Sequence, residues 1–534
     1  MNQETKMKMI GMQAVLLISA AFAALTPVRA ENVFANLKSG KADVVATEYG
    51  AVKGYGANGV SSFLGVPYAA PPVGELRWKA PSAPSKWTTV RDAGYFGNSC
   101  VQTLTFGDFA ERSTSEDCLY LNVFAPAKAR NKLRPVMVWI HGGGLVNGRS
   151  NDYDGRKLVS DGNTVVVTLN YRLNVFGFLA HPALDSDGQA SVSYGVMDQQ
   201  FALQWVKRNI KAFGGDPDNV TLFGESAGGL SILFHLVSPP AAGLFHKAIL
   251  QSGVSVAPQI PLEVGQKSGQ TFASAAGCTD QTAACLRSLS VEQIIKAGPF
   301  TGTAMRVVDG KIMKQPVQQA LAQGNFHKVP VLMGNNHDEY TWFVGLTELS
   351  NEKPLTPEEY PKTLNAAYGA EKGAKILAEY PLSNYASPSE ALAAAQTSWF
   401  FVCPSFKAMR SLSKHVPVYA YEFMDRTAPY SFRSVSFPYN AAHTLDIQYL
   451  FPRFHGAQGT PRPLNAKQQN LSADMISYWT NFAAKGHPNS KAAPAWLPYT
   501  AANEQLQLLD LPRPRSATEK DTGVDRKCAF WDQL

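Results

Sequence analysis

Residues 224–228 read Gly-Glu-Ser-Ala-Gly, a serine flanked by glycines at the spacing of a nucleophile turn. The apolar run 220–223 precedes this motif, and a segment typical of a helix, 229–237, follows it. Glycines give the backbone room for a sharp strand-to-helix turn that exposes the serine hydroxyl. The pentapeptide also occurs by chance in long chains. It is the flanking strand and helix that predict Ser226 as a nucleophile for acyl transfer.

A glycine run follows a second apolar segment. Residues 136–140 lead into 141–144, which read His-Gly-Gly-Gly. Acyl transfer creates an oxyanion, which needs N–H donors held about 3 Å away. Glycine amides can point into such a site, and the amide of Ala227, directly after the serine, is the expected companion donor. A flexible loop or a phosphate cradle is the alternative, but the glycine spacing and the Lys-Ser/Thr pair of phosphate loops are absent.

A serine is a weak nucleophile unless a base takes its proton and an acid orients that base. In folds with this serine turn, the acid and then the histidine follow the serine in the chain. The histidines after Ser226 are His235, His246, His327, His337, His415, His443, His455 and His487. His443 is favoured because it lies in a loop before the apolar run 445–451, and His455 is its nearest rival.

Two adjacent carboxylates are the candidates for the acid. Asp338 and Glu339 follow the strand-like run 329–333 and the segment 334–337, Gly-Asn-Asn-His. The residues themselves do not decide between the two carboxylates.

Strands and helices alternate around these motifs. Strand-like runs occur at 136–140, 165–169, 220–223 and 247–250, with amphipathic segments such as 197–213 between them. This order predicts an α/β protein with a mostly parallel, doubly wound sheet. The shorter segments before about residue 126 suit antiparallel edge strands, and 254–380 contains long helical insertions.

Composition and the N-terminus indicate an exported globular protein. Of 534 residues, 45% are hydrophobic and 17% charged, which excludes a disordered chain. Residues 1–30 have a basic start, an apolar stretch and a small-x-small end, the layout of a secretory signal peptide, with an uncleaved anchor as the alternative. The remaining 31–534 suit one catalytic domain better than several. Their net charge of +5 and the absence of basic runs imply no nucleic-acid partner, and no later stretch is long enough to span a membrane.

Six cysteines follow the leader: Cys100, Cys118, Cys278, Cys285, Cys403 and Cys528. An even count in an exported chain argues for disulfides, and six cysteines allow 15 pairings. Nearest-neighbour pairing joins the first two and the next two, which leaves the last two for each other. No Cys-x-x-Cys or His-rich spacing competes as a metal site.

Together these residues resemble the type-B carboxylesterases, the cholinesterase-like branch of the α/β-hydrolases. The resemblance runs from residues 63–69 (Phe-Leu-Gly-Val-Pro-Tyr-Ala) to 527–531 (Lys-Cys-Ala-Phe-Trp). The other markers are 116–123, 141–144, 170–172, 213–217, 224–229, 338–339 and 442–447.

The resemblance implies an α/β-hydrolase fold and a serine carboxylesterase without metal or organic cofactor. It implies Ser226 as nucleophile, His443 as base and Glu339 as acid, because the family uses the second acid of the 338–339 pair. The implied oxyanion donors are the amides of Gly143, Gly144 and Ala227. It supports the Cys100–Cys118 and Cys278–Cys285 disulfides and makes Cys403–Cys528 plausible. The implied structural ion pairs are Arg77 with Glu116 and Arg172 with Asp198.

Three departures from the family pattern bear on the pocket. Thr444 stands where the family usually has glycine, so the resemblance does not imply the conformation of the loop after the histidine. Leu145 replaces a frequent phenylalanine, a change expected to affect the acyl pocket. The segment between Cys100 and Cys118 contains no tryptophan, which argues against choline esters as preferred substrates.

Three functions are therefore weighed. The first is a secreted or periplasmic serine carboxylesterase acting on small-molecule esters. The second is a non-catalytic adhesion module of the same fold, but such modules lack the nucleophile. The third is a lipase, for which the short Cys100–Cys118 loop is a poor lid. The natural ester and the oligomeric state are not indicated by the sequence.

Overall fold

A computed structural model gives the structure of the chain. It describes residues 40–103, 111–127, 132–185, 192–255, 259–298, 306–452, 454, 461–491, 493–522 and 525–534. The predicted signal peptide at 1–30 and the rival histidine His455 lie outside these residues.

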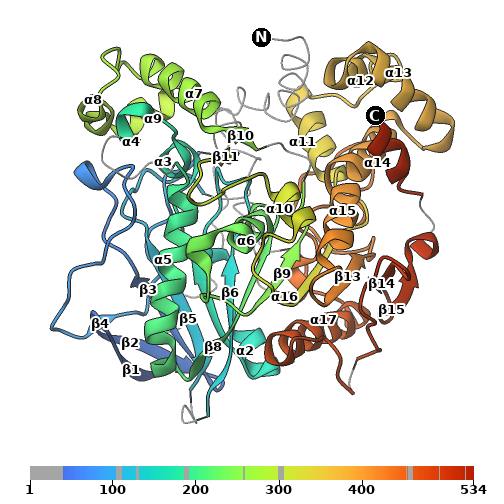
Figure 1. Cartoon of the computed structure of the whole chain (residues 1–534). Coiled ribbons are helices and arrows are strands. Elements are labelled where there is room, and N and C mark those ends of the chain that lie inside the picture. Colours follow the sequence, from blue (N-terminus) through green and yellow to red (C-terminus); the bar gives the residue numbers. More distant parts are fainter. Residues whose placement is uncertain are drawn as a thin grey trace.

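One 13-stranded sheet runs through the described residues, in the order β1-β2-β3-β5-β7-β6-β8-β9-β12-β13-β14-β15 with β4 beside β2 (Figure 1). Its strands are β1 (Lys41–Thr47), β2 (Gly50–Ala57), β3 (Val60–Pro67), β4 (Arg91–Asp92), β5 (Tyr120–Pro126), β6 (Arg134–Ile140), β7 (Val165–Leu169), β8 (Gly215–Glu225), β9 (Lys247–Gln251), β12 (Val331–Asn336), β13 (Val418–Phe423), β14 (Gln505–Leu509) and β15 (Arg515–Thr518). A separate pair joins β10 (Ile260–Pro261) to β11 (Val307–Val308).

The strands from β7 to β14 in this order are parallel, and β1, β2, β3 and β5 form an antiparallel edge. The predicted α/β fold with antiparallel N-terminal edge strands is confirmed. The structure adds an antiparallel strand at the other edge, where β15 pairs with β14.

Helices cover both faces of the sheet. The principal ones are α2 (Arg156–Gly162), α5 (Tyr194–Asn209), α6 (Ala227–Val237), α10 (Val317–Gln323), α15 (Cys403–Leu412), α16 (Ile447–Leu450) and α17 (Ala466–Lys485). Val136 and Val138 of β6 belong to a core with residues of α5, α6, α10 and α15. Met137 and Trp139 belong to a second core with α2, α16 and α17. This alternation explains the unbroken apolar run of β6, because a parallel strand is buried on both faces.

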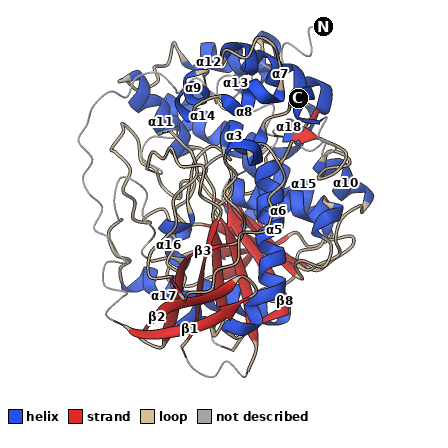
Figure 2. Cartoon of the chain, turned by 90° about the vertical axis from the view of Figure 1, so that its left-hand side faces the viewer, coloured by secondary structure: helices blue, strands red, loops and turns tan. Residues whose placement is uncertain are grey.

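Further helices gather beyond one end of the sheet, as Figure 2 shows. They are α3 (Asn174–Phe178), α4 (Pro182–Asp185), α7 (Leu262–Ala275), α8 (Ala283–Ser288), α9 (Val291–Lys296), α11 (Thr341–Asn351), α12 (Tyr360–Tyr368), α13 (Ala370–Glu379), α14 (Pro388–Gln396) and α18 (Cys528–Gln533). A π-helix, η8 (Thr397–Val402), joins α14 to α15. These elements include the helical insertions predicted within 254–380.

Disulfides join Cys100 to Cys118, Cys278 to Cys285, and Cys403 to Cys528, so all six cysteines are paired as the resemblance implies. The first two close short loops, whereas the third joins residues 125 positions apart. Among the described residues no helix is long and apolar enough to cross a membrane.

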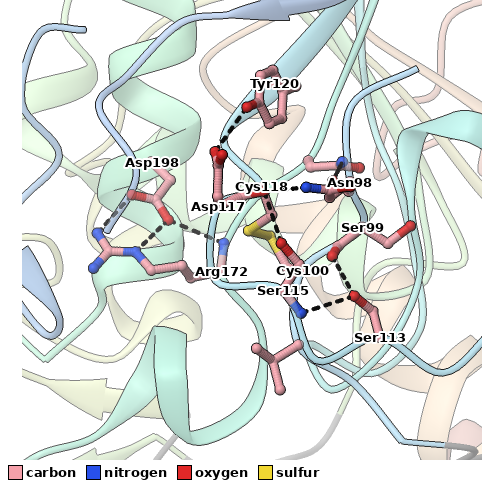
Figure 3. Close-up of a disulfide and its surroundings, with 12 residues drawn as sticks. Asn98, Ser99, Cys100, Ser113, Ser115, Asp117, Cys118, Tyr120, Arg172 and Asp198 are labelled. Atoms are coloured by element: carbon pink, nitrogen blue, oxygen red, sulfur yellow. Dashed lines mark hydrogen bonds and ion pairs between the residues drawn. A yellow bond between two sulfur atoms is a disulfide. The ribbon is translucent and has the colours of Figure 1, made fainter. Parts of the chain in front are cut away.

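Two buried ion pairs fix the surroundings of the first disulfide. Arg172 donates to both carboxylate oxygens of Asp198, at 2.7 and 2.8 Å, beside the Cys100–Cys118 bridge (Figure 3). Arg77 donates to Glu116 and also to the carbonyl oxygens of Arg287 and Leu289. Both pairs are those that the resemblance implies, and the second connects the α8–α9 insertion to the N-terminal part.

Candidate active site

Ser226 is the single residue between the end of β8 and the start of α6. Its backbone has φ 56° and ψ −121°, a conformation that is strained for any residue with a side chain. The glycines make this turn possible, because a Cβ on Gly228 would lie 1.9 Å from the carbonyl oxygen of Ile140. The N–H of Ser226 donates to the carbonyl oxygen of Gln251 at 2.8 Å. The turn is thus bonded to β9, and Ser226 remains only partly buried.

The glycine run lies against the serine turn. A Cβ on Gly142 would lie 3.2 Å from the Cβ of Ser226, so the two backbones approach closely. Gly143 and Gly144 have φ of 98° and 65°, which favour glycine, and a Cβ on Gly143 would lie 2.1 Å from the carbonyl oxygen of Asn147. The predicted oxyanion donors therefore come from two segments that the fold brings together. Ala227 adds the first amide of α6, an N–H without a partner inside its helix.

The histidine before this run supports the loop. Burial lowers the pKa of His141 to about 4, so its ring is neutral at pH 7. The ring stacks on Tyr171 with centroids 4.4 Å apart, and the Tyr171 hydroxyl donates to the carbonyl oxygen of His141 at 2.9 Å.

Glu339, in the turn after β12, meets His443, in the long loop between β13 and α16. Nδ1 of His443 donates to Oε2 of Glu339 at 2.5 Å, and the backbone N–H of His443 donates to the carbonyl oxygen of Glu339 at 3.2 Å. The other carboxylate oxygen accepts from the N–H of Asn336 at 2.8 Å. Asp338 instead accepts from exposed Arg426. The structure thus brings the second acid of the pair, and not the first, to His443.

The other nitrogen of His443 faces a second carboxylate. Its Nε2 lies 3.2 Å from Oε1 of Glu225, the residue before Ser226. Among the described residues Nε2 makes no hydrogen bond, so none joins it to the hydroxyl of Ser226. Such contacts are often open in enzymes without substrate and tighten in the substrate complex.

The two carboxylates set the charge of His443. Burial lowers the pKa of His443, but Glu225 and Glu339 outweigh burial and raise the pKa to about 9. Burial raises the pKa of Glu225 to about 8, against the opposing effect of His443. Both groups therefore keep their protons to higher pH than the free side chains do.

A buried polar network connects the serine turn to the histidine loop. The sequence motifs predicted no role for the residues of this network. Gln251, whose carbonyl binds the Ser226 amide, donates from Nε2 to Asp446 at 2.7 Å and accepts from Trp479 at 3.0 Å. Asn336 donates to the carbonyl oxygen of Ala442 and to Asp446. Asp446 lies inside the marker 442–447, which was the only sequence signal for this network.

Three aromatic rings surround His443, and no sequence motif indicated them. The ring centroids of Trp342, Phe343 and Phe401 lie 5.9, 5.2 and 4.9 Å from that of His443. The first two belong to α11, which starts two residues after Glu339, and Phe401 belongs to the π-helix η8. Single π-helical turns often occur at functional sites.

The backbone conformation bears on two of the departures from the family pattern, Thr444 and Leu145. Thr444 has φ 76°, a left-handed conformation that glycine adopts without strain, which accounts for the usual glycine there. Leu145 also has a positive φ, 64°, and is buried in the core shared with α5 and α6.

One group of described side chains has the spacing of a metal site: Cys278, Asp280 and Cys285. The two sulfur atoms are bonded to each other, so neither is a thiolate ligand. The group therefore fits a disulfide and not a metal ion.

Comparison with known proteins agrees with this geometry. A sequence model of the Carboxylesterase family matches residues 41–531. The chain belongs to the carboxylesterase family. A carboxylesterase hydrolyses carboxylic esters, and the family implies a serine mechanism and small-molecule ester substrates.

Individual carboxylesterases match over most of the chain. Acylcarnitine hydrolase of Mus musculus is 36% identical over 85% of this chain and 84% of its own length. Para-nitrobenzyl esterase of Bacillus subtilis (strain 168) is 36% identical over 88% of this chain and 94% of its own. A solved structure of PNB esterase has a TM-score of 0.74 and 33% identity, and the match covers 90% of this chain and 98% of that one. The disulfides are compatible with an exported carboxylesterase.

Proposed function

We propose that this carboxylesterase acts through Ser226 as nucleophile, His443 as general base and Glu339 as the acid that orients the base. The contact of His443 Nδ1 with Glu339 at 2.5 Å carries the proposal. With Nδ1 engaged, the tautomer that donates to Glu339 leaves Nε2 free to take a proton, and that atom faces the turn of Glu225 and Ser226.

In this mechanism the hydroxyl oxygen of Ser226 attacks the ester carbonyl while His443 takes the hydroxyl proton. The oxyanion accepts hydrogen bonds from the amides of Gly143, Gly144 and Ala227, which are fixed before the reaction begins. His443 then gives its proton to the leaving alcohol, and an acyl-serine remains. Water activated by His443 releases the acid and restores the serine.

The aromatic surroundings of His443 favour esters with an aromatic or other apolar alcohol part. The imidazole protonates the departing alcohol, so the alcohol lies beside the imidazole when it leaves. Aromatic rings next to the imidazole therefore also contact this alcohol. Phe343 is only partly buried and lies 5.2 Å from His443, which makes it the ring best exposed to such a group. The name para-nitrobenzyl esterase, carried by one relative, agrees with this preference.

The processing of the chain belongs to the same proposal. We infer that residues 1–30 are a signal peptide, that 31–534 form a single catalytic domain, and that the enzyme is secreted or periplasmic. Three disulfides support this location, because such bonds persist in oxidising compartments.

Replacing the serine tests the mechanism. Ser226→Ala is expected to abolish hydrolysis of a short-acyl nitrophenyl ester while the circular dichroism spectrum stays unchanged. Ser274→Ala, on an exposed part of α7, is the matched control and keeps full activity. A fluorophosphonate is expected to label Ser226 in the wild type. Turnover by the Ser226→Ala enzyme, or a label on another residue, would contradict the proposal.

A further inference from the structure

The C-terminal segment brings one buried guanidinium against the turn that carries Glu339. Arg526 is 3% exposed, although it lies only eight residues from the end of the chain. Its Nη2 contacts Oε1 of Glu422 and donates to the carbonyl oxygen of His337 at 3.0 Å. The proposed mechanism uses none of these three residues.

Glu422 and His337 are also buried, and they complete the cluster. Nδ1 of His337 lies 2.6 Å from Oε1 of Glu422 and 2.7 Å from Nη2 of Arg526. Burial raises the pKa of Glu422, but Arg526 and His337 outweigh burial and lower that pKa to about 2. Glu422 is therefore ionised, and Arg526 is its counter-ion. A buried charge that loses its partner is strongly unfavourable, so the surroundings of Glu422 depend on Arg526.

The carbonyl that Arg526 binds belongs to the acid turn, residues 336–339. The N–H of Asn336 donates to the carboxylate of Glu339, and the N–H of His337 donates to the carbonyl oxygen of Phe423 on β13. The turn is thus bonded to β13 through one side of His337 and to Arg526 through the other. Displacing that carbonyl would move the backbone that positions Glu339.

The segment around Arg526 is held by covalent and polar contacts. Cys528 is bonded to Cys403, the first residue of α15. Lys527 donates to the carboxylate of Glu379 at 2.7 Å, and Trp531 donates to the hydroxyl of Tyr380 at 2.9 Å. Phe530 and Trp531 of α18 pack against a cluster of residues from α12, α13 and α14, and Figure 1 shows the C-terminus beside these helices.

The helical unit that carries Cys403 also contacts the candidate site. Cys403 directly follows η8, whose Phe401 ring lies 4.9 Å from His443. Thr397, at the start of η8, accepts from the N–H of Tyr340, the residue after Glu339, at 2.9 Å. The disulfide therefore joins Arg526 to the same helical unit that contacts both sides of the Glu339–His443 pair.

We propose that Arg526, held by the Cys403–Cys528 disulfide, is a positioning residue for the carboxylate of Glu339. The inference rests on the proposed role of Glu339. Arg526 fixes the acid turn through the carbonyl of His337 and through Glu422. The last residues of the chain thereby contribute to the alignment of the base.

Substitution of Arg526 measures this contribution. Arg526→Met is expected to lower kcat per active site about tenfold, with KM within about twofold, because a misplacement of about 1 Å far from the chemistry can cost up to 100-fold. Active sites are counted with the fluorophosphonate, which separates misalignment from loss of folded enzyme. Arg526→Lys keeps the charge and is expected to restore most of kcat.

The effect of the same Arg526 substitution in a Glu339→Gln enzyme shows whether Arg526 acts through Glu339. In a Glu339→Gln enzyme, Arg526→Met is expected to cause little further loss of kcat, because the group it positions is already changed. The same loss in both backgrounds would mean a merely structural role and would overturn the inference. Full activity of Glu339→Gln alone would remove Glu339 from the mechanism, and this inference with it.

Removing the Cys403–Cys528 disulfide is a second test of the inference that does not depend on the Arg526 variants. Cys403→Ala with Cys528→Ala is expected to reproduce the loss of kcat per labelled site, even if Arg526→Met yields no folded enzyme. Cys278→Ala with Cys285→Ala is the matched control, since that bridge ties the α7–α8 region, and it is expected to keep kcat. Equal kcat for both double variants and the wild type would overturn the role of the bridge.

Discussion

Oε1 of Glu225 lies 3.2 Å from Nε2 of His443, while Glu339 occupies the other nitrogen of the same ring. The imidazole is thus held between two buried carboxylates. In the proposed mechanism, this arrangement stabilises the imidazolium that forms when His443 takes the serine proton. It also keeps the resting imidazole protonated to higher pH than an isolated histidine.

The pH profile is the first prediction. His443 must be neutral to act as base, and its pKa is raised to about 9, so kcat/KM of the wild type is expected to rise from neutral pH towards pH 9. Glu225→Gln removes one of the acidic groups facing His443 and leaves Glu339 and Asp446. The pKa of His443 then decreases, and the acid limb of kcat/KM moves to lower pH. Glu371→Gln, on exposed α13, is the control without a shift. An acid limb that stays in place or moves upward in Glu225→Gln would refute the assignment.

The second prediction concerns the oxyanion donors. Gly143→Ala is expected to lower kcat by about 100-fold, because the loss of one preorganised donor costs about 10²–10³ in kcat. The added Cβ would meet the carbonyl oxygen of Asn147 and turn the amide away. Gly277→Ala has a similar φ of 96° but meets nothing within 4 Å, so it controls for backbone strain. Similar rates for the two variants would count against the oxyanion role.

The third prediction concerns stability. Gln251→Leu removes the donor to Oδ2 of Asp446 and the acceptor of the indole N–H of Trp479. Buried polar groups left unpaired cost about 1–3 kcal/mol, so the free energy of unfolding is expected to fall by about that amount. Urea denaturation measures it. Gln270→Leu, on an exposed position of α7, is expected to change stability by less than about 0.5 kcal/mol. An unchanged midpoint for Gln251→Leu would contradict the role of the network.

The fourth prediction concerns the alcohol part of the ester. Phe343→Ala is expected to lower kcat/KM for a benzyl ester about tenfold relative to the ethyl ester of the same acid, the size of a lost apolar contact. Leu349→Ala, further along α11 and only partly buried, is expected to leave that ratio unchanged. Equal losses for both esters in Phe343→Ala would show that the ring only supports the fold.

The sequence predicted the parts of the site that depend on local backbone chemistry. The glycines around Ser226 and at 142–143 are needed because a Cβ there would clash with a nearby backbone, and Gly144 has a positive φ. Such requirements produce a recognisable glycine pattern in the sequence. The preference for Glu339 over Asp338 came from resemblance alone. Asp338 and Glu339 are adjacent and of the same chemical type, and only tertiary structure sends one to Arg426 and the other to His443.

The parts that the sequence missed depend on contacts between distant segments. β12 continues to Asn336, beyond the apolar run that ended at residue 333, because the polar residues Asn335 and Asn336 pair with β13. Gln251 and Asp446 meet from segments 195 residues apart, and although Asp446 lies in the marker 442–447, no local pattern shows that the two side chains meet. Arg526 and Glu422 also meet from distant segments. From sequence alone, both would be expected on the surface as ordinary charged residues.

In the proposed mechanism, the strands on the two sides of β8 lead to residues with different catalytic roles. On one side, β6 leads into backbone amides that stabilise negative charge. On the other side, β9, β12 and β13 lead to the side chains that transfer or direct the proton. Apart from the amide of Ala227, electrophilic assistance thus comes from the chain before Ser226, whereas Glu339 and His443 come from the chain after it. A variant library confined to residues 134–144 would therefore change electrophilic assistance without replacing Glu225, Glu339 or His443.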